Sequence, residues 1–175
     1  MNKNFFEVKN VDFKVGGKNK VNNVSFSIKK EGEVICLLGP SGIGKTTILR
    51  TIAGLEKINN GSIELMGKTL SSKKINVEPE ERNISLAFQE NSLFPHYTLK
   101  RNILLGAERN KDKGKQRIEF EEIIDLLDIS QILDKYPHQV SAGEAQRASL
   151  ARSLITQPDL LLLDEPLSNV DQSFK

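Results

Sequence analysis

The chain has 175 residues, 38% of them hydrophobic and 27% charged, which fits one globular domain of ordinary composition. Its net charge of +2 argues against nucleic acid as the main partner, and its single cysteine excludes a disulfide framework within the chain and suits a reducing compartment. No stretch approaches the roughly 20 apolar residues of a membrane-spanning helix, so we expect any membrane association to come through a partner.

The N-terminal part alternates between apolar and polar residues, as strands with one solvated face do. Residues 5–15 and 21–28 show this alternation, with a slip in phase near Asn10, and the pair Gly16-Gly17 between them predicts a turn. The continuous apolar run at 34–38, which contains the cysteine, predicts a buried strand.

A glycine-rich turn follows this run and opens a helical pattern. It has the G-x-x-x-x-G-K-[ST] spacing of a phosphate-binding loop, with the residues Gly39, Pro40, Ser41, Gly42, Ile43, Gly44, Lys45, Thr46 and Thr47. Its backbone N–H groups and the start of the helix favour an anion. We expect Lys45 to reach the β- and γ-phosphates of ATP and Thr46 to ligate Mg²⁺. Glycine-rich turns also occur without a ligand, and that alternative stays open here.

The chain then predicts a strand, a loop-rich stretch and mainly helices. Gly54 is a plausible end for the first helix. The predicted elements that follow are a strand at 62–67, polar loops at 68–82, a strand at 84–88, a helix at 98–105, an exposed charged loop at 106–117 and helical spacing at 120–127. We therefore divide the chain into a nucleotide-binding core, residues 1–88 and 158–175, and a helical subdomain, residues 89–157.

Four leucines, 160–163, followed by Asp164, Glu165 and Pro166 predict a central parallel strand with two carboxylates at its end. Ligands bind at the carboxyl ends of strands in open α/β sheets. Asp164 could hold Mg²⁺, and Glu165 could orient or deprotonate a water that attacks the γ-phosphate. The alternative is that these residues merely end a strand.

The segment Val140-Ser141-Ala142-Gly143-Glu144-Ala145-Gln146-Arg147 has a local explanation. Ser141 and Glu144, three residues apart, form a capping box for a helix that runs through Leu154. The segment also resembles the signature motif of the ABC transporter ATPases, usually Leu-Ser-Gly-Gly-Gln. Other matching motifs are the Q-loop glutamine at Gln89, Leu93-Phe94-Pro95-His96 after it, Tyr136-Pro137-His138 before the signature, and a D-loop at Ser168-Asn169-Val170-Asp171.

This resemblance runs from about Val8 to the last residue and is nearest to importers of the ferric-iron and polyamine type. It implies an α/β P-loop NTPase fold with an antiparallel β subdomain and a helical subdomain. It implies catalytic roles for Glu165, Gln89 and Lys45, and magnesium ligation by Thr46, Gln89 and Asp164. Two copies would face each other head to tail, with each ATP also touching Ser141, Gly143 and Glu144 of the other copy.

The resemblance also implies partners. Leu93, Phe94 and Tyr97, expected to be exposed, would contact a transmembrane permease, and a periplasmic or extracellular solute-binding protein would deliver the solute. The alternative is that these side chains pack inside the helical part. The resemblance also implies that the protein lies at the cytoplasmic face of the inner membrane, as a peripheral subunit.

The sequence departs from the family in several places. Val15 stands where the family stacks an aromatic ring on adenine, Ala142 and Glu144 replace a glycine and the glutamine of the signature, and Asn169 and Val170 stand where the D-loop usually has Ala and Leu. The family continues beyond the D-loop to a switch histidine, whereas both histidines here, His96 and His138, precede Asp164. We therefore expect a truncated chain with an incomplete core sheet.

The leading hypothesis is ATP binding and hydrolysis that drive solute import. Two alternatives remain: an ATP-binding module without turnover, and a soluble ABC-type ATPase that acts on nucleic acid or ribosomes. Soluble ABC-type ATPases of that kind usually carry long coiled-coil or paired-domain insertions, or basic arms, and none is seen in this sequence.

Overall fold

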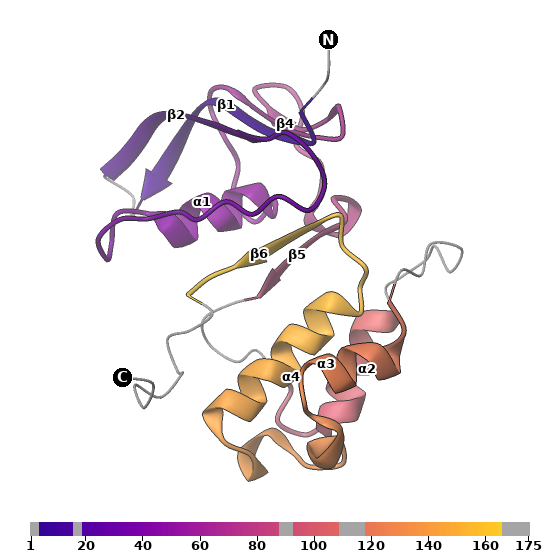
Figure 1. Ribbon diagram of the computed structural model, residues 1–175. Helices are drawn as coiled ribbons and strands as arrows, with labels where there is room; N and C mark the ends of the chain where they lie inside the picture. The colour runs from indigo at the N-terminus through magenta and orange to yellow at the C-terminus, as the bar shows by residue number, and fades with distance from the viewer. Residues whose placement is uncertain (1–3, 16–18, 88–92, 109–117, 166–175) are drawn as a thin grey trace. The chain divides into compact units, whose positions relative to one another are not determined.

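The computed structural model describes residues 4–15, 19–87, 93–108 and 118–165 (Figure 1). The chain divides into two compact units, Met1–Arg82 and Asn83–Lys175, which we describe separately as unit 1 and unit 2. The division into core and helical subdomain that the sequence suggests stays a prediction.

Unit 1 is built on a four-stranded antiparallel sheet with the order β2-β1-β3-β4. Its strands are β1 (Phe6–Val15), β2 (Asn19–Ile28), β3 (Ser62–Leu65) and β4 (Lys68–Ser72). The two predicted N-terminal strands are confirmed, while Gly16 and Gly17 lie outside the described residues. The phase slip near Asn10 is a β-bulge, where Asn10 takes φ 51 and the register shifts between Val8 and Val11.

The stretch 68–82 is not all loop, as the sequence suggested. Its first five residues form β4, which pairs with β3 through a turn at Met66 and Gly67. Leu70 and Ser71 of this strand are buried, at 1% and 0% exposure. The sequence does not predict β4, because its residues are mostly polar. The strand forms through backbone hydrogen bonds to β3, which do not require a run of apolar side chains.

Helix α1 (Lys45–Ile52) packs on this sheet and ends as predicted. Gly54 takes φ 92 and donates its N–H to the carbonyl of Thr51 at 3.0 Å, which is a glycine-type helix stop. The buried face of α1 includes Ile48 and Ile52, which are 9% and 1% exposed.

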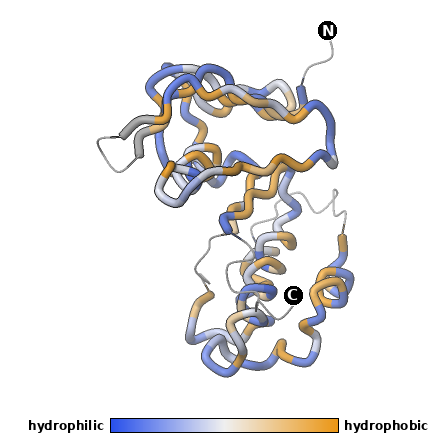
Figure 2. Tube along the Cα trace, turned by 60° about the vertical axis from the view of Figure 1, so that its left-hand side comes forward, coloured by the Kyte–Doolittle hydropathy of each residue, from blue (hydrophilic) through white to orange (hydrophobic). Residues whose placement is uncertain are grey.

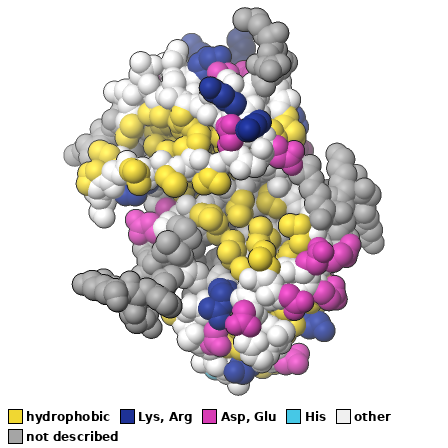
Figure 3. Space-filling model, viewed as in Figure 1, with side chains coloured by type: hydrophobic (Ala, Val, Ile, Leu, Met, Phe, Trp, Pro, Cys, Tyr) yellow, Lys and Arg dark blue, Asp and Glu magenta, His cyan; other side chains and the backbone are white. Residues whose placement is uncertain are grey.

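The prediction of a buried strand at 34–38 is wrong for this structure. The segment has no strand pairing within the described residues, and Val34 and Leu38 are 86% and 91% exposed. Cys36, which was expected inside that strand, is exposed too. Figure 3 shows apolar side chains gathered on this face of unit 1. An apolar run becomes a strand only when another strand takes its backbone hydrogen bonds, and none does so in the described part of the chain.

Unit 2 holds a two-stranded parallel sheet of β5 (Ile84–Ala87) and β6 (Leu160–Leu163). The bond from Asn83 Nδ2 to Asp159 Oδ2, at 2.8 Å, pins the starts of both strands. The expectation of a strand covered on both faces is wrong for β6 here, because Leu162 is 7% exposed and Leu163 is 39% exposed. In the described residues β6 has β5 as its neighbour on one side.

Three helices form the rest of unit 2: α2 (Leu99–Ala107), α3 (Phe120–Leu126) and α4 (Ala142–Leu154). The predicted loop at 106–117 starts too early, since residues 106–107 belong to α2 and 109–117 lie outside the described residues. Apolar and polar residues interleave along the helices (Figure 2). Their apolar faces share a core that includes Leu99, Ile103, Ile123, Ala148 and Ala151, each at 0% exposure.

Short 3-10 helices connect these elements, at Pro79–Glu81 in unit 1 and at Ser130–Ile132 and Pro137–Gln139 in unit 2. Among the described residues, no helix has both the length and the apolar character that a bilayer crossing requires.

Candidate functional site

The glycine-rich loop of unit 1 leads directly into α1. Gly44 is the N-cap of this helix and takes φ 108, and Gly42 takes φ 79. Both values lie in the left-handed region, which glycine enters at little cost and other residues rarely adopt. The loop also closes on itself, because the N–H of Ile43 donates to the carbonyl of Pro40 at 3.4 Å. The sequence thus bends the backbone sharply at the point where the helix N–H groups begin.

Lys45 lies across this loop. Its Nζ donates to the carbonyl oxygens of Gly39 and Pro40, at 2.9 and 3.1 Å. The ammonium group of Lys45 thus lies beside the first turn of α1, and the N–H groups of a first turn have no acceptor within their own helix. A phosphate oxygen is a stronger acceptor than a neutral carbonyl, so an anion in the loop would compete well for these donors.

The other loop residues leave access to this point. Ser41, Gly42 and Thr46 are exposed, while Lys45 and Thr47 are half-buried. The helix begins here with no acidic residue in its first turn, so its positive dipole end is not neutralised locally. The loop, helix end and lysine therefore bring together the groups that favour an anion, and phosphate binding at this point stays a prediction.

The two carboxylates of the second candidate half end β6 in unit 2. Asp164 is 6% exposed, and its N–H donates to the carbonyl of Ala87 at 3.0 Å, which extends the β5–β6 pairing by one bond. Glu165 is exposed and takes φ 47, a left-handed conformation that costs a non-glycine residue about 1–2 kcal/mol. The structure therefore buries the first carboxylate and turns the chain sharply at the second.

The donor set suits a magnesium ion. Mg²⁺ is usually held by one or two carboxylates together with substrate phosphates, and the Thr46 hydroxyl and the Asp164 carboxylate are oxygen ligands of this kind. Clusters of three or more His, Cys, Asp or Glu do not occur among the described residues. Because the two halves belong to different units, their convergence on one magnesium ion stays a prediction.

The signature segment forms the start of α4, with the predicted capping box. The Ser141 Oγ accepts from the N–H of Glu144 at 3.3 Å, and Glu144 Oε2 accepts from the N–H of Ser141 at 2.7 Å. These bonds, first the one from the backbone of Ser141, lower the pKa of Glu144. Gly143 lies in the first turn of the helix and is half-buried. The carboxylate of Glu144 is thus turned back onto its own helix end.

Some of the predicted site residues lie outside the described residues. These are Gln89 and the D-loop, residues 168–171. Val15 ends β1, where it pairs with Asn19, and its side chain is likewise outside what the structure describes.

The segment after the Q-loop presents an aromatic cluster. Phe94 is 46% exposed, and its ring lies 6.0 Å from those of His96 and Tyr97, with the guanidinium of Arg152 5.8 Å from the Phe94 ring. Leu93 and Tyr97 were also expected to be exposed. This is wrong for Leu93, which is 9% exposed and packs in the core of unit 2, and Tyr97 is half-buried. The alternative that the segment packs inside the helical part therefore holds for Leu93.

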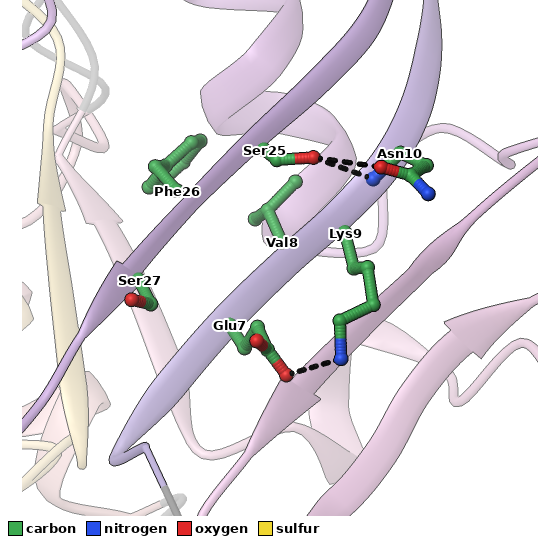
Figure 4. Close-up of a pocket in the computed structure, with 7 residues that line it drawn as sticks. All are labelled: Glu7, Val8, Lys9, Asn10, Ser25, Phe26 and Ser27. Carbon is green, nitrogen blue, oxygen red and sulfur yellow. Dashed lines mark hydrogen bonds and ion pairs between the residues drawn. The ribbon is translucent and has the colours of Figure 1, made fainter.

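A shallow pocket lies on β1 and β2, away from the phosphate loop (Figure 4). Its polar side chains already bond one another: Ser25 Oγ donates to Asn10 Oδ1 at 3.0 Å, and Lys9 Nζ pairs with Glu7 Oε2 at 3.0 Å. It contains none of the predicted site residues, and we assign it no ligand.

Sequence reasoning missed two buried polar residues, Arg82 and Asn102, which are 2% and 0% exposed. Each binds several backbone carbonyls next to a candidate functional segment. A lone arginine before a strand and a lone asparagine in a helix have no sequence signature, because both residue types are mostly exposed.

Comparison with known proteins gives these features a family context. Residues 21–168 match the family described as ABC transporter. A relative from Photorhabdus laumondii, the Fe(3+) ions import ATP-binding protein FbpC, is 41% identical over 173 residues, which are 98% of this chain and 48% of the relative. The spermidine/putrescine import ATP-binding protein PotA of Chromobacterium violaceum is 42% identical over 170 residues, 97% of this chain and 46% of the relative. The chain spans about half the length of the curated relatives it matches.

Solved structures agree. MJ1267, an ATP-binding cassette of an ABC transporter, has a TM-score of 0.77 at 25% identity, over 97% of this chain and 72% of that one. The cassette MJ0796, solved as a dimer in a post-hydrolysis state with ADP and Pi, has a TM-score of 0.74 at 26% identity, over 96% and 77%. The expected fold class, an α/β P-loop NTPase with an antiparallel sheet and a helical part, is confirmed.

Proposed function

The chain belongs to the ABC transporter family, and from this membership we propose that it forms the ATP-binding and ATP-hydrolysing part of the motor subunit of an importer. The observation that carries the proposal is the loop at the start of α1. Gly44 caps the helix in a left-handed conformation, and Lys45 lies across the loop. The lysine and the helix start, the groups expected to bind a triphosphate, are therefore close together, which supports the proposal.

In this function the phosphate loop binds the β- and γ-phosphates. Lys45 exchanges its bonds to Gly39 and Pro40 for bonds to phosphate oxygens. Bound magnesium would neutralise developing charge on the phosphates, with Thr46 and Asp164 as its protein ligands. Glu165 orients the attacking water and accepts its proton, and Gln89 assists at the metal.

Two copies of the chain would bind ATP between them, head to tail. The MJ0796 structure, a dimer bound to ADP and Pi, supports the part of this proposal that concerns a dimer. The helix α4 offers its N-terminal N–H groups, with Ser141 and Gly143, to the γ-phosphate held by the other copy. Association would then depend on ATP, and hydrolysis would release the pair.

We further propose the partners and the place of this subunit. The aromatic cluster of Phe94, His96 and Tyr97 contacts a transmembrane permease, because aromatic side chains serve as interface anchors. Phe94 and His96 are exposed in this cluster, and Tyr97 is half-buried. The subunit would lie at the cytoplasmic face of the inner membrane, and a solute-binding protein would deliver the solute. The names of the relatives favour ferric iron or a polyamine as that solute.

The test uses the whole chain and separates binding from turnover. Mg-ATP binding is measured by displacement of trinitrophenyl-ATP, and hydrolysis by release of phosphate. We expect Lys45→Ala to weaken binding about tenfold or more, because it removes a charge-assisted bond to phosphate. Glu165→Gln should retain binding and lose turnover. Lys57→Ala, an exposed lysine of the same unit, is the matched control and should bind as the unmodified chain does.

Failure of the unmodified chain to bind Mg-ATP would refute the proposal. Binding without phosphate release would instead favour the alternative of an ATP-binding module without turnover. Equal effects of Lys45→Ala and Lys57→Ala would show that the loop is not the phosphate site.

A further inference from the structure

Arg82 is the most deeply buried charged side chain of those that the structure describes in unit 1. It is 2% exposed and follows the 3-10 helix Pro79–Glu81. Burial lowers the pKa of its guanidinium, and the nearby carboxylate of Glu78 offsets part of this effect. Burial of a cation is costly unless its hydrogen bonds are satisfied, so its partners show what it is for.

The guanidinium of Arg82 binds three segments of unit 1 at once, and each acceptor is a neutral oxygen. The acceptors are the carbonyls of Thr51 (3.3 Å) and Ile52 (2.9 Å) at the end of α1, the carbonyl of Leu70 (3.4 Å) and Oγ of Ser71 (2.8 Å) in β4, and Oδ1 of Asn76 (3.2 Å) and the carbonyl of Val77 (2.8 Å) in the following loop. The arginine therefore joins the end of α1 to the edge of the sheet.

The end of α1 is shaped to receive this side chain. The last carbonyls of a helix have no partner within the helix and carry its negative dipole end, which a cation stabilises. Gly54, just past the helix, has φ +92, and a Cβ at this position would lie 2.4 Å from the Arg82 Nε. A glycine is therefore needed here for space as well as for backbone conformation.

The other end of the same helix is the phosphate loop. Helix α1 has eight residues, so its two ends are about 12 Å apart and are joined by the backbone hydrogen bonds of the helix. We propose that Arg82 is a positioning residue for nucleotide binding: by holding the carbonyls of Thr51 and Ile52 it fixes the helix that presents Gly44, Lys45 and Thr46 to the phosphates. This inference rests on the proposed function.

The experiment compares substitutions of Arg82 with core substitutions in the same unit. The whole chain is studied as the unmodified protein, Arg82→Lys and Arg82→Met. Ile63→Val and Leu65→Ala in β3 are the controls, because they lower stability and leave the bonds from Arg82 to the end of α1 in place. The dissociation constant of Mg-ATP is measured by displacement of trinitrophenyl-ATP, well below the Tm of each variant. We expect Arg82→Lys to weaken binding about tenfold and Arg82→Met to weaken it more, while the controls bind as the unmodified chain does.

A second measurement does not need nucleotide. Hydrogen exchange is followed at the N–H groups of Ala53 and Gly54, which bond the carbonyls of Leu49 and Thr51. Exchange at these two amides should be faster in Arg82→Lys, with exchange in β1 and β2 unchanged. If Arg82→Met does not fold, this measurement on Arg82→Lys is the deciding test. Binding by Arg82→Lys within twofold of the unmodified chain, or exchange at Ala53 and Gly54 no faster than in Leu65→Ala, would overturn the inference. Absence of binding by the unmodified chain would instead count against the proposed function.

Discussion

Asn102 should determine the conformation of the segment that carries the aromatic cluster. It lies in α2 with 0% exposure, and its Nδ2 is 3.1 Å from each of the carbonyl oxygens of Phe94, Tyr97 and Thr98. Its Oδ1 accepts from the N–H of Phe94 at 2.7 Å. One side chain thus replaces the backbone pairing that this irregular segment lacks.

The expected cost of Asn102→Ala follows from these bonds. The two Nδ2 hydrogens can make two full bonds, and each typically contributes about 1 kcal/mol net. The Phe94 N–H loses the Oδ1 acceptor in a part-buried place, which adds about 1–2 kcal/mol for an unsatisfied donor. We therefore expect Asn102→Ala to lower the free energy of unfolding of unit 2 by about 3–4 kcal/mol.

Native-state hydrogen exchange of the amides in α2 and α4 is the suitable assay, because it reports the stability of one unit without requiring the whole chain to unfold in a single step. The matched control is Arg101→Ala, one residue earlier on the exposed face. The Arg101 Nη1 pairs with Glu108 Oε1 at 2.6 Å, with both side chains about half exposed, and such a pair contributes about 0–1 kcal/mol.

Asn102→Asp gives a second test with nearly the same shape. The ionised carboxylate cannot donate to the three carbonyls, and burial raises its pKa above the usual range of an aspartate. The folded form then binds a proton more tightly than the unfolded form, so the stability of this variant should rise as the pH falls. A loss below about 1 kcal/mol in Asn102→Ala, or a loss equal to that of Arg101→Ala, would refute the reasoning.

Three further predictions concern the helix contact, the signature helix and the adenine position. Gly106→Ala should destabilise unit 2 by about 1–3 kcal/mol, since its Cβ would lie 2.5 Å from the carbonyl oxygen of Arg152. Hydrogen exchange of the amides in α2 and α4 measures this loss, and an unchanged stability would contradict the prediction. The bonds from Ser141 lower the pKa of the folded-state Glu144 carboxyl. The stabilisation by the ionised carboxylate should therefore be complete above the ordinary glutamate pKa of 4.5 and be lost as the pH falls through the lower pKa of the folded state. The difference in Tm between the unmodified chain and Glu144→Gln, measured against pH, should vanish in acid. Val15→Tyr should tighten Mg-ATP binding roughly tenfold by restoring a stacking ring, and an unchanged dissociation constant would exclude adenine from this position.

The elements that the sequence predicted correctly are those determined by neighbouring residues. The alternation at 5–15, the phase slip at Asn10 and the capping box of Ser141 and Glu144 each depend on residues a few positions apart. The glycine-rich turn into α1 belongs to this group too, because its glycines adopt their conformation within one turn.

The features that the sequence missed depend on distant partners. The polar strand β4 forms because β3 pairs with it, and Arg82 is buried because α1 and β4 present carbonyls to it from more than ten residues away. The residues next to Arg82 in the sequence therefore do not show that its side chain will be buried. The error at 34–38 has the same origin, since the sequence showed a strand's composition and could not show its partner.

The two flanks of the phosphate loop are therefore held differently. On the helix side, α1 is anchored by its buried face and by Arg82. On the other side, residues 34–38 are exposed and have no strand pairing among the described residues. Lys45 connects the two sides, because it extends from the helix and bonds the carbonyls of Gly39 and Pro40. In this state the lysine holds the loop together as well as presenting a charge for phosphate. Its bonds to neutral carbonyls are the ones that an incoming phosphate would replace, so loop shape and phosphate affinity depend on the same side chain.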